Sequence, residues 1–215
     1  MQRLDGRVTA DVVTIIPTYL RADLAKAAVL SALAQQDVDE VDHQIVVIDD
    51  GGGELPDVDH PRVHLVTLSR NIGTAGVVRN IGLRISSSPR VAFLDDDNAW
   101  LPEHLAISLA AHADGAQFTY TTLRRRLADG TLLDHLGVPF DRHRMRHQAY
   151  VDTNAVVVVR DRGVWFSRVP RRRDTIPGED WEFAHRLSRR LRTQHVDVTT
   201  VEYRIHAGSY YTDWD

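Results

Sequence analysis

Apolar runs alternate with amphipathic segments along the first half of the chain. Four of the runs are continuous and rich in β-branched residues, which is typical of strands buried on both faces, and they cover 12–16, 45–48, 63–68 and 91–94. Apolar residues at helical spacing predict helices over about 23–36, 75–85 and 102–112, with Asp23 and Thr74 as the N-caps of the first two. This order of elements predicts an α/β domain of three layers with a mainly parallel central sheet.

The second half of the chain has a less regular pattern. Strands are predicted over 116–123, 155–159 and 196–203, with a turn at 128–130 that leads into a short partner strand. A helix is predicted over about 181–190, whereas 140–150 is rich in His and Arg and shows no clear period. Because no repeat, low-complexity tract or linker interrupts the pattern, residues 1–215 are predicted to form one domain.

Composition limits the classes of protein to consider. The 215 residues carry a net charge of −4 and are 43% hydrophobic, as in an ordinary globular protein and unlike a nucleic-acid binder. The chain has no cysteine, which excludes disulfides and thiolate chemistry and suits a cytoplasmic location. The longest apolar run, 155–159, is far too short to cross a bilayer, so any membrane contact is expected to be peripheral. These features leave the oligomeric state open.

Polar residues follow three of the four predicted strands of the first half. They are Pro17-Thr18-Tyr19, Asp49-Asp50 and Asp95-Asp96-Asp97. In parallel α/β sheets, ligands bind outside the carboxyl ends of the strands. Three such ends converging on one crevice therefore predict a binding site there.

The three consecutive aspartates suggest a bound cation. On an extended backbone Asp95 and Asp97 point to one side and Asp96 to the other. Like charges this close push one another toward protonation unless a cation or hydrogen-bond donors lie among them, and a divalent metal is the simplest remedy. A polar, capped strand end explains residues 90–100 about equally well when they are taken alone.

The glycine pattern excludes one class of nucleotide site and favours another. No Gly-x-Gly-x-x-Gly follows the first strand, and the chain contains no Gly-Lys-Ser/Thr ending of a P-loop. The glycines at 51–53 instead follow Asp49 and Asp50, whose carboxylates would repel a bare phosphate but accept hydrogen bonds from a base or ribose. A nucleotide whose phosphates are held by a metal and by arginine fits better, and Arg79 is the candidate cation, although a lone helical arginine is usually solvated.

Three later positions have both a chemical and an ordinary structural explanation. Glu179 and Asp180 follow Gly178, where an acid is either a proton acceptor or a residue that favours the first turn of a helix; taken alone, the second explanation is preferred. His206 is either a metal ligand or an ordinary histidine. The arginines at 171–173 form either a clamp for an anion or a solvated loop, and the loop is preferred.

Five short motifs occur in an order that resembles a known family. They are Ile15–Arg21, Val47–Gly51, Arg70–Gly73 with Arg79-Asn80, Phe93–Asp97 and Gly178–Asp180. Together they resemble the family 2 inverting glycosyltransferases of GT-A fold, over about residues 11–190. The resemblance implies a Rossmann-like GT-A domain, with a nucleotide-binding half over about 11–115 and a small acceptor-binding half over about 116–215.

The resemblance also implies a role for each matching residue. Pro17, Thr18, Tyr19 and Arg21 would line the nucleotide pocket, Asp50 with Asp49 would bind the base, and Arg79 would lie near the base or diphosphate. Asp95, Asp96 and Asp97 would form the DXD-type element, with Asp96 on the ribose and sugar, Asp97 on Mg²⁺ or Mn²⁺, and Asp95 supporting the loop. Asp180 would deprotonate the acceptor hydroxyl, and His206 would join the metal or diphosphate site.

The implied reaction is a metal-dependent, inverting transfer of one sugar from a nucleotide-diphosphate sugar, most simply a UDP-sugar, to an acceptor hydroxyl. The Gln-x-x-Arg-Trp signature of processive synthases is absent, which favours a single addition. One departure from the family is Gly52-Gly53, where a serine or similar residue is usual. Two alternatives remain open: a nucleotidyltransferase, which would want a glycine-rich basic loop after the first strand, and a non-catalytic module that binds sugar nucleotides.

Overall fold

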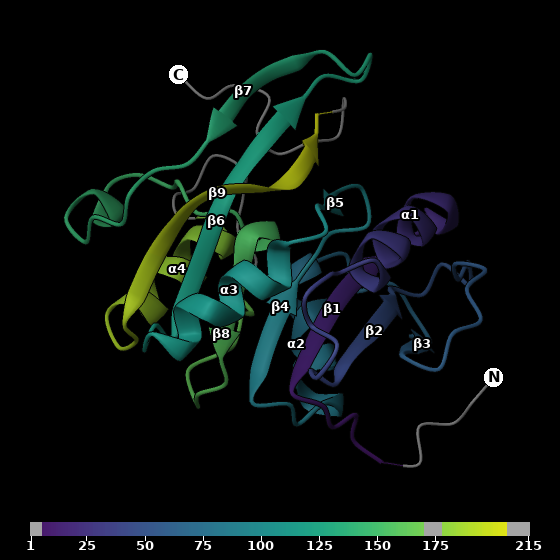
Figure 1. The fold of residues 1–215 in the computed structure, drawn as a ribbon. Helices are drawn as coiled ribbons and strands as arrows, with labels where there is room; N and C mark the ends of the chain where they lie inside the picture. Colours follow the sequence, from purple (N-terminus) through teal and green to yellow (C-terminus); the bar gives the residue numbers. More distant parts are fainter. Residues whose placement is uncertain (1–5, 170–177, 206–215) are drawn as a thin grey trace.

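The computed structural model describes residues 6–169 and 178–205, which form one sheet with helices on both faces (Figure 1). The strands are β1 (Val12–Thr18), β2 (His43–Asp49), β3 (Val63–Thr67), β4 (Arg90–Phe93), β5 (Ala99–Trp100), β6 (Phe118–Arg126), β7 (Leu132–Leu136), β8 (Val156–Val159) and β9 (Thr193–Arg204). The helices are α1 (Ala22–Leu33), α2 (Ala75–Ile85), α3 (His104–Ala113) and α4 (Glu179–Ser188), with short 3₁₀ turns η1 (Arg144–Arg146) and η2 (Thr153–Ala155). The predicted α/β class is confirmed.

The first four strands form a parallel block at one side of the sheet. β1 pairs in parallel with β2 and β4, and β2 pairs in parallel with β3. The apolar runs of β1 and β2 are almost wholly buried, which explains why they lack the alternation of a half-exposed strand. The pairing aligns Thr18 with Asp49, so the polar residues after these strands meet at the same edge.

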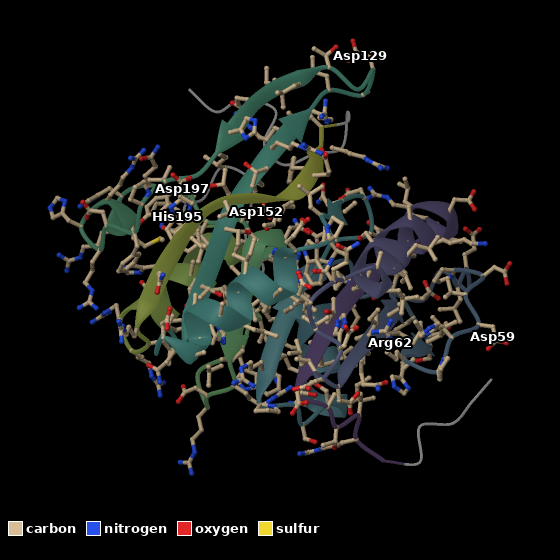
Figure 2. All side chains as sticks on the ribbon, viewed as in Figure 1. Asp59, Arg62, Asp129, Asp152, His195 and Asp197 are labelled. Carbon is tan, nitrogen blue, oxygen red and sulfur yellow. The ribbon has the colours of Figure 1, made fainter. Side chains whose placement is uncertain are left out.

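The remaining strands extend the sheet with mixed directions in the order β4-β8-β6-β9-β5. β8 runs antiparallel to both β4 and β6, whereas β6 and β9 are parallel, and most residue pairs of the whole sheet are parallel. β7 forms the predicted hairpin with β6, and Asp129 lies at its tip, away from the rest of the molecule (Figure 2). The antiparallel β4–β8 pair places the residues just before β8 beside the acidic end of β4.

Two details near the site differ from the predicted elements. Asp23 is not an N-cap: α1 starts at Ala22 after Arg21, whose carbonyl accepts the first helical hydrogen bond from Ala25 N, so Asp23 lies in the first turn. The predicted helix from 102 starts at His104, because Ala99 and Trp100 first form β5 against β9. A two-residue strand leaves no periodic pattern from which to predict it.

The aromatic core fixes α4 against the sheet. Phe166 and Phe183 stack with ring centroids 4.2 Å apart, and Phe93 of β4 meets both rings edge-on at 5.2 and 5.6 Å. In Figure 1, α2 and α4 lie behind the sheet and α3 in front of it. None of the helices among the described residues is long and apolar enough to cross a membrane.

Candidate active site

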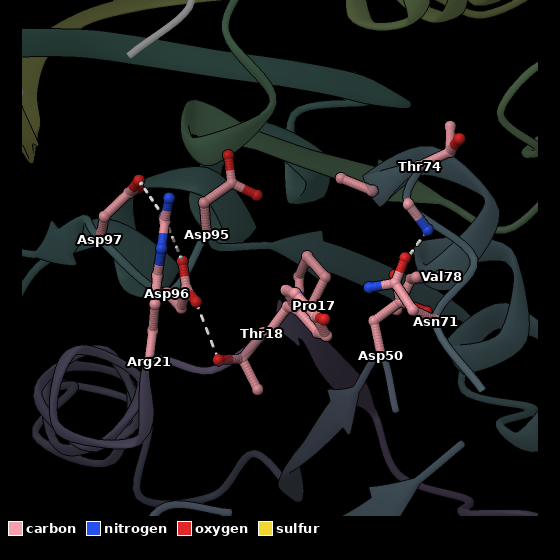
Figure 3. Close-up of a pocket in the computed structure, with 13 residues that line it drawn as sticks. Pro17, Thr18, Arg21, Asp50, Asn71, Thr74, Val78, Asp95, Asp96 and Asp97 are labelled. Atoms are coloured by element: carbon pink, nitrogen blue, oxygen red, sulfur yellow. Dashed lines mark hydrogen bonds and ion pairs between the residues drawn. The ribbon is translucent and has the colours of Figure 1, made fainter. Parts of the chain in front are cut away.

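A cavity of about 400 Å³ lies where the parallel strands end (Figure 3). Of the predicted site residues, its lining includes Pro17, Thr18, Tyr19, Arg21, Asp50 and the three aspartates 95–97. It also includes Asn71, Thr74 and Val78, from the loop before α2 and from α2 itself. The convergence of strand ends predicted from the sequence is therefore present, and the loop before α2 together with the start of α2 forms a further wall.

Asp96 joins the end of β4 to the end of β1. Thr18 Oγ1 donates a hydrogen bond to Asp96 Oδ2 at 2.8 Å, and Arg21 Nη1 lies 3.3 Å from Asp96 Oδ1 and 3.0 Å from Asp97 Oδ2. Burial raises the pKa of Asp96 to about 6, against the hydrogen bond from Thr18, which lowers it. Part of the repulsion among the aspartates is thus relieved by hydrogen-bond donors of the chain itself.

Asp95 is held by a buried asparagine from the segment before β8. Asp95 N donates to Asn154 Oδ1 at 2.6 Å, and Asn154 Nδ2 donates to Asp95 Oδ2 at 3.1 Å. The same amide nitrogen donates to Asp152 Oδ1 at 2.7 Å, and Asp152 lies in the interior beside β6 and β9 (Figure 2). Burial, with the nearby charge of Asp95, raises the pKa of Asp152 to about 6. Asp152 and Asn154 are therefore part of the site, and no sequence motif singled them out.

Arg79 links the two halves of the chain. Its side chain is only 2% exposed, it forms a short ion pair with Asp95, and its Nη1 lies 3.4 Å from Glu179 Oε1 and 3.3 Å from Asp180 Oδ1. Burial alone would lower the pKa of Arg79, but these three carboxylates raise it. The guanidinium also stacks over Phe166 at 5.1 Å. Arg79 thus lies between the aspartates of β4 and the acids of α4, and the cavity lining does not include it.

The two acids of α4 have different contacts. Glu179 Oε1 accepts a hydrogen bond from Gly76 N at 2.8 Å, which ties the start of α4 to the start of α2. Among the described residues, Arg79 is the one side chain that forms a hydrogen bond or ion pair with Asp180. Burial raises the pKa of Asp180, although Arg79 opposes this shift. A carboxylate with a raised pKa, separated by one guanidinium group from the cavity residue Asp95, is suited to accept a proton near neutral pH.

Asp49 and Asp50 fix the loops at the far side of the cavity. Asp49 accepts hydrogen bonds from the backbone N–H groups of Gly52 and Gly53 at 2.9 and 2.7 Å. Asp50 accepts them from Ile72 and Gly73, both at 2.8 Å, and it lines the cavity whereas Asp49 does not. The geometry therefore favours Asp50 over Asp49 as the residue that reaches a ligand.

The other predicted residues and the possible ligands of a metal ion complete the description of the site. His206 and the arginines at 171–173 lie outside the described residues. Among the described residues no group of three or more His, Cys, Asp or Glu side chains is arranged to hold a metal ion. The oxygen donors at 95–97 are nevertheless of the type that hard cations prefer, and Mg²⁺ usually takes only one or two carboxylates together with substrate phosphates.

Sequence comparison gives relatives that are glycosyltransferases or proteins of polysaccharide biosynthesis. The chain is 34% identical over 132 residues to succinoglycan biosynthesis protein ExoO of Rhizobium meliloti (strain 1021), which covers 57% of this chain and 36% of that protein. It is 37% identical over 109 residues to validoxylamine A glucosyltransferase of Streptomyces hygroscopicus subsp. jinggangensis (strain 5008), covering 47% of this chain and 25% of that one. The chain thus spans well under half the length of either relative.

Comparison with solved structures shows the fold. The crystal structure of S. aureus TarS 1–349 in complex with UDP-GlcNAc superimposes with a TM-score of 0.66 at 16% identity, over 95% of this chain and 62% of that one. Its complex with UDP gives the same TM-score over 91% of this chain and 60% of that one. The expected GT-A fold is confirmed.

The family model for glycosyl transferase family 2 matches residues 13–168, a range that contains the cavity, the three aspartates and Asn154. This chain belongs to glycosyl transferase family 2.

Proposed function

We propose that this protein transfers one sugar from a nucleotide-diphosphate sugar, with a UDP-sugar as the preferred donor, to an acceptor hydroxyl by a single inverting displacement. The observation that carries the proposal is the shared contact of Asp95 and Asp180 with Arg79. It places Asp180, an acid of the second half of the chain, across one guanidinium group from Asp95, which lines the cavity of the first half. A displacement at an anomeric carbon needs this arrangement, with charge stabilisation at the leaving group and a base that approaches from another side.

The cavity has the features expected of a donor site. Its lining carries hydroxyl and carboxylate groups from Thr18, Asp50 and Asp96, which suit the polar edges of a base, ribose and sugar. The volume of about 400 Å³ falls in the range of small-ligand sites. UDP-GlcNAc and UDP are bound in the crystal structures of TarS, which supports a UDP-sugar here as the donor.

A divalent cation fits the donor set at this cavity. Asp97, with a side chain 19% exposed, would contribute a carboxylate oxygen to Mn²⁺ or Mg²⁺, and Asp95 or Asp96 would support it. When bound, the cation would neutralise part of the negative charge of the leaving diphosphate. Arg21, which pairs with Asp96 and Asp97, is placed to add a second positive charge beside the same phosphates.

Asp180 is proposed as the base that removes the proton from the acceptor hydroxyl. Arg79 would hold the carboxylate in orientation and keep a positive charge next to it. Glu179 is engaged by the backbone of α2, so of the two acids Asp180 is the one free to meet the acceptor.

Titration calorimetry with UDP, GDP and their sugar conjugates, with and without Mn²⁺, tests the donor and cation assignments. We expect UDP to bind more tightly with Mn²⁺, and Asp97→Ala to lose the Mn²⁺-dependent part, about tenfold or more in affinity. Asp59→Ala is the matched control and should bind as the wild type does, because Asp59 is exposed, does not line the cavity and lies at the right edge of the molecule in Figure 2. Undiminished Mn²⁺-dependent binding by Asp97→Ala would remove the metal assignment, and no response to any nucleotide would overturn the proposed donor.

A further inference from the structure

A second groove, rich in arginine and histidine, lies between η1 and the last turns of α4. Its volume is about 530 Å³, and its lining consists of Arg142, His143, Arg146, His185 and Arg189. None of these residues lines the candidate active site, and no carboxylate is among them. The groove therefore presents positive charge and hydrogen-bond donors without an acidic partner in its wall.

The loop that carries the first three of these residues is held firmly against α4. Trp181 Nε1 donates a hydrogen bond to Met145 O at 2.6 Å, and the Met145 side chain is 1% exposed. The Tyr150 hydroxyl also holds the start of this loop, because it donates a hydrogen bond to Asp141 O at 2.8 Å. With Met145 turned inward, its exposed neighbours Arg144 and Arg146 face outward. The groove is thus a formed feature of the fold.

The cations of the groove are not neutralised within the part of the chain that the structure describes. There, the side chains of Arg146, His185 and Arg189 form no hydrogen bond or ion pair, and Arg142 donates only to Ser188 O, at 3.2 Å. Two acids close in sequence to the groove residues, Asp141 and Glu182, have other partners, although Glu182 also lines an adjoining cavity with His185 and Arg189. Asp141 accepts hydrogen bonds from the backbone of residues 143 and 144, and Glu182 pairs with Arg186 at 2.7 Å.

Helix electrostatics explains only part of this cluster. Cationic side chains in the last turn of a helix are favoured by its macrodipole, which accounts for His185 and Arg189. It does not account for Arg142 and Arg146, which come from another segment and are brought to the same helix end against the repulsion of like charges. An anionic ligand would remove that repulsion.

The groove and the proposed base share one helix. Trp181, His185 and Arg189 are spaced four residues apart and so lie along one face of α4, whereas Asp180, one residue before Trp181, lies about 100° round the helix from that face. At 1.5 Å per residue, Asp180 and Arg189 are separated by roughly 14 Å along the axis. A ligand chain that passes from Asp180 to the face of Trp181 and then along that face would reach the groove.

We infer that the groove binds a phosphate or carboxylate group of an anionic acceptor, while another part of the same acceptor presents its hydroxyl to Asp180. Guanidinium groups form paired hydrogen bonds with either anion, which makes three arginines a suitable site for both. The assignment of this anion to the acceptor rests on the proposed glycosyl transfer.

Binding of soluble polyanions to the whole chain tests the inference. Inorganic polyphosphate and polygalacturonate serve as the phosphate and carboxylate probes, and neutral dextran as the uncharged one. We expect at least one polyanion to bind, with amide shifts in ¹⁵N spectra confined to η1 and the end of α4, and dextran not to bind. Arg146→Gln with Arg189→Gln should weaken binding by about tenfold, since two charge-assisted contacts are lost.

The matched control removes the same charge elsewhere, by Arg84→Gln with Arg162→Gln, two exposed arginines outside the groove. Equal losses in the two double variants, or no polyanion binding by the wild type, would overturn the inference. So would binding to phosphatidylglycerol vesicles without binding to either soluble probe, which would indicate a membrane surface. Calorimetry with UDP on the same samples tests the donor site separately. If the wild type bound a polyanion but not UDP, the proposed transfer would be refuted, and the assignment of the anion to an acceptor with it.

Discussion

At the scale of single residues, the site depends on a few buried side chains that satisfy several charges at once. Arg79 meets three carboxylates, and Asn154 binds both the backbone and the carboxylate of Asp95 while also donating to Asp152. Because each partner is partly or wholly shielded from water, removing one group leaves others without a partner. Substitution of Arg79 or Asn154 should therefore disturb the orientation of the neighbouring acids more than substitution of a residue at the surface would.

Asn154→Ala tests this orientation. The variant leaves Asp95 N and Asp152 without their amide partner, so we expect a loss of about 1–3 kcal/mol in unfolding free energy and a weaker Mn²⁺-dependent affinity for UDP. Asn80→Ala is the matched control, because Asn80 is equally buried and makes two hydrogen bonds at 2.9 Å to the backbone of Phe166. Equal loss of UDP affinity in both variants would mean that Asn154 acts only through stability.

Asp180 gives a prediction for the dependence of activity on pH. Burial raises the pKa of its carboxyl group, and a base must be ionised to accept a proton, so kcat/KM for UDP-sugar turnover should rise with pH through this raised pKa. The acidic limb of the profile is then expected well above the ordinary range of aspartic acid. Asp180→Asn should keep the affinity for UDP and lose turnover together with that limb. A fully active Asp180→Asn variant would contradict its role as base.

At the scale of secondary-structure elements, the important contact is that between the starts of α2 and α4. Glu179 accepts from Gly76 N, and the stacked rings of Phe166 and Phe183 hold α4 beside α2 and β4. This contact sets the position of Asp180 relative to the aspartates at the end of β4. The function of Gly76 follows from it, because any side chain there would enter the space used by Glu179.

Gly76→Ala should therefore displace the start of α4. A Cβ at this position would lie 2.8 Å from Glu179 Oε2 and 2.9 Å from Phe166 Cβ, which outweighs the better helix propensity of alanine. We expect a loss of roughly 1–3 kcal/mol in stability together with reduced turnover. Gly82→Ala is the control, since its Cβ would meet Ile15 Cγ2 at 2.6 Å in the core, away from α4. If both variants lost turnover only in proportion to stability, the α2–α4 contact would have no specific role.

The sequence pattern predicts these helices and strands well, but it does not predict which of them lie side by side in the folded chain. β1, β2 and β4 were predictable because long β-branched runs end abruptly in polar residues, and α2 has the predicted bounds, Ala75–Ile85. The role of Asn154 was not predictable, because it follows from the antiparallel pairing of β8 with β4, between residues more than sixty positions apart. The partners of Arg79 on α4, about a hundred positions away, were hidden for the same reason.

At the scale of the whole molecule, buried histidines tie stability to pH. Burial lowers the pKa of His43 and His112 to about 4 and that of His104 to about 3. Each takes up a proton more readily in the unfolded chain, so its contribution to stability is complete above about pH 6.5 and is lost as the pH falls toward the lowered value. The raised pKa values of Asp96 and Asp152 act in the opposite direction between about pH 4 and 6.

His43→Gln isolates the histidine contribution. Glutamine retains a group able to bond Thr14 Oγ1, which lies 2.8 Å from His43 Nε2, but it does not titrate. Thermal unfolding followed between pH 7 and pH 4.5, roughly the window of this titration, should show a smaller fall in stability for the variant than for the wild type. His143→Gln, which exchanges the same residue types at an exposed position, is the control for the substitution itself. Identical slopes for wild type and His43→Gln would contradict the lowered pKa of His43.

The Arg79 bridge also determines when the site can form during synthesis of the chain. Arg79 and Asp180 are separated by 101 positions, and Asp95 and Asn154 by 59. Contacts over such distances form late, since a long loop must close before they contribute. A nascent chain that has emerged only as far as β6 contains the residues lining the cavity but neither the amide that orients Asp95 nor the acid paired with Arg79. We therefore expect the site proposed for sugar transfer to be completed in the last steps of folding, after the parallel strands at the cavity have formed.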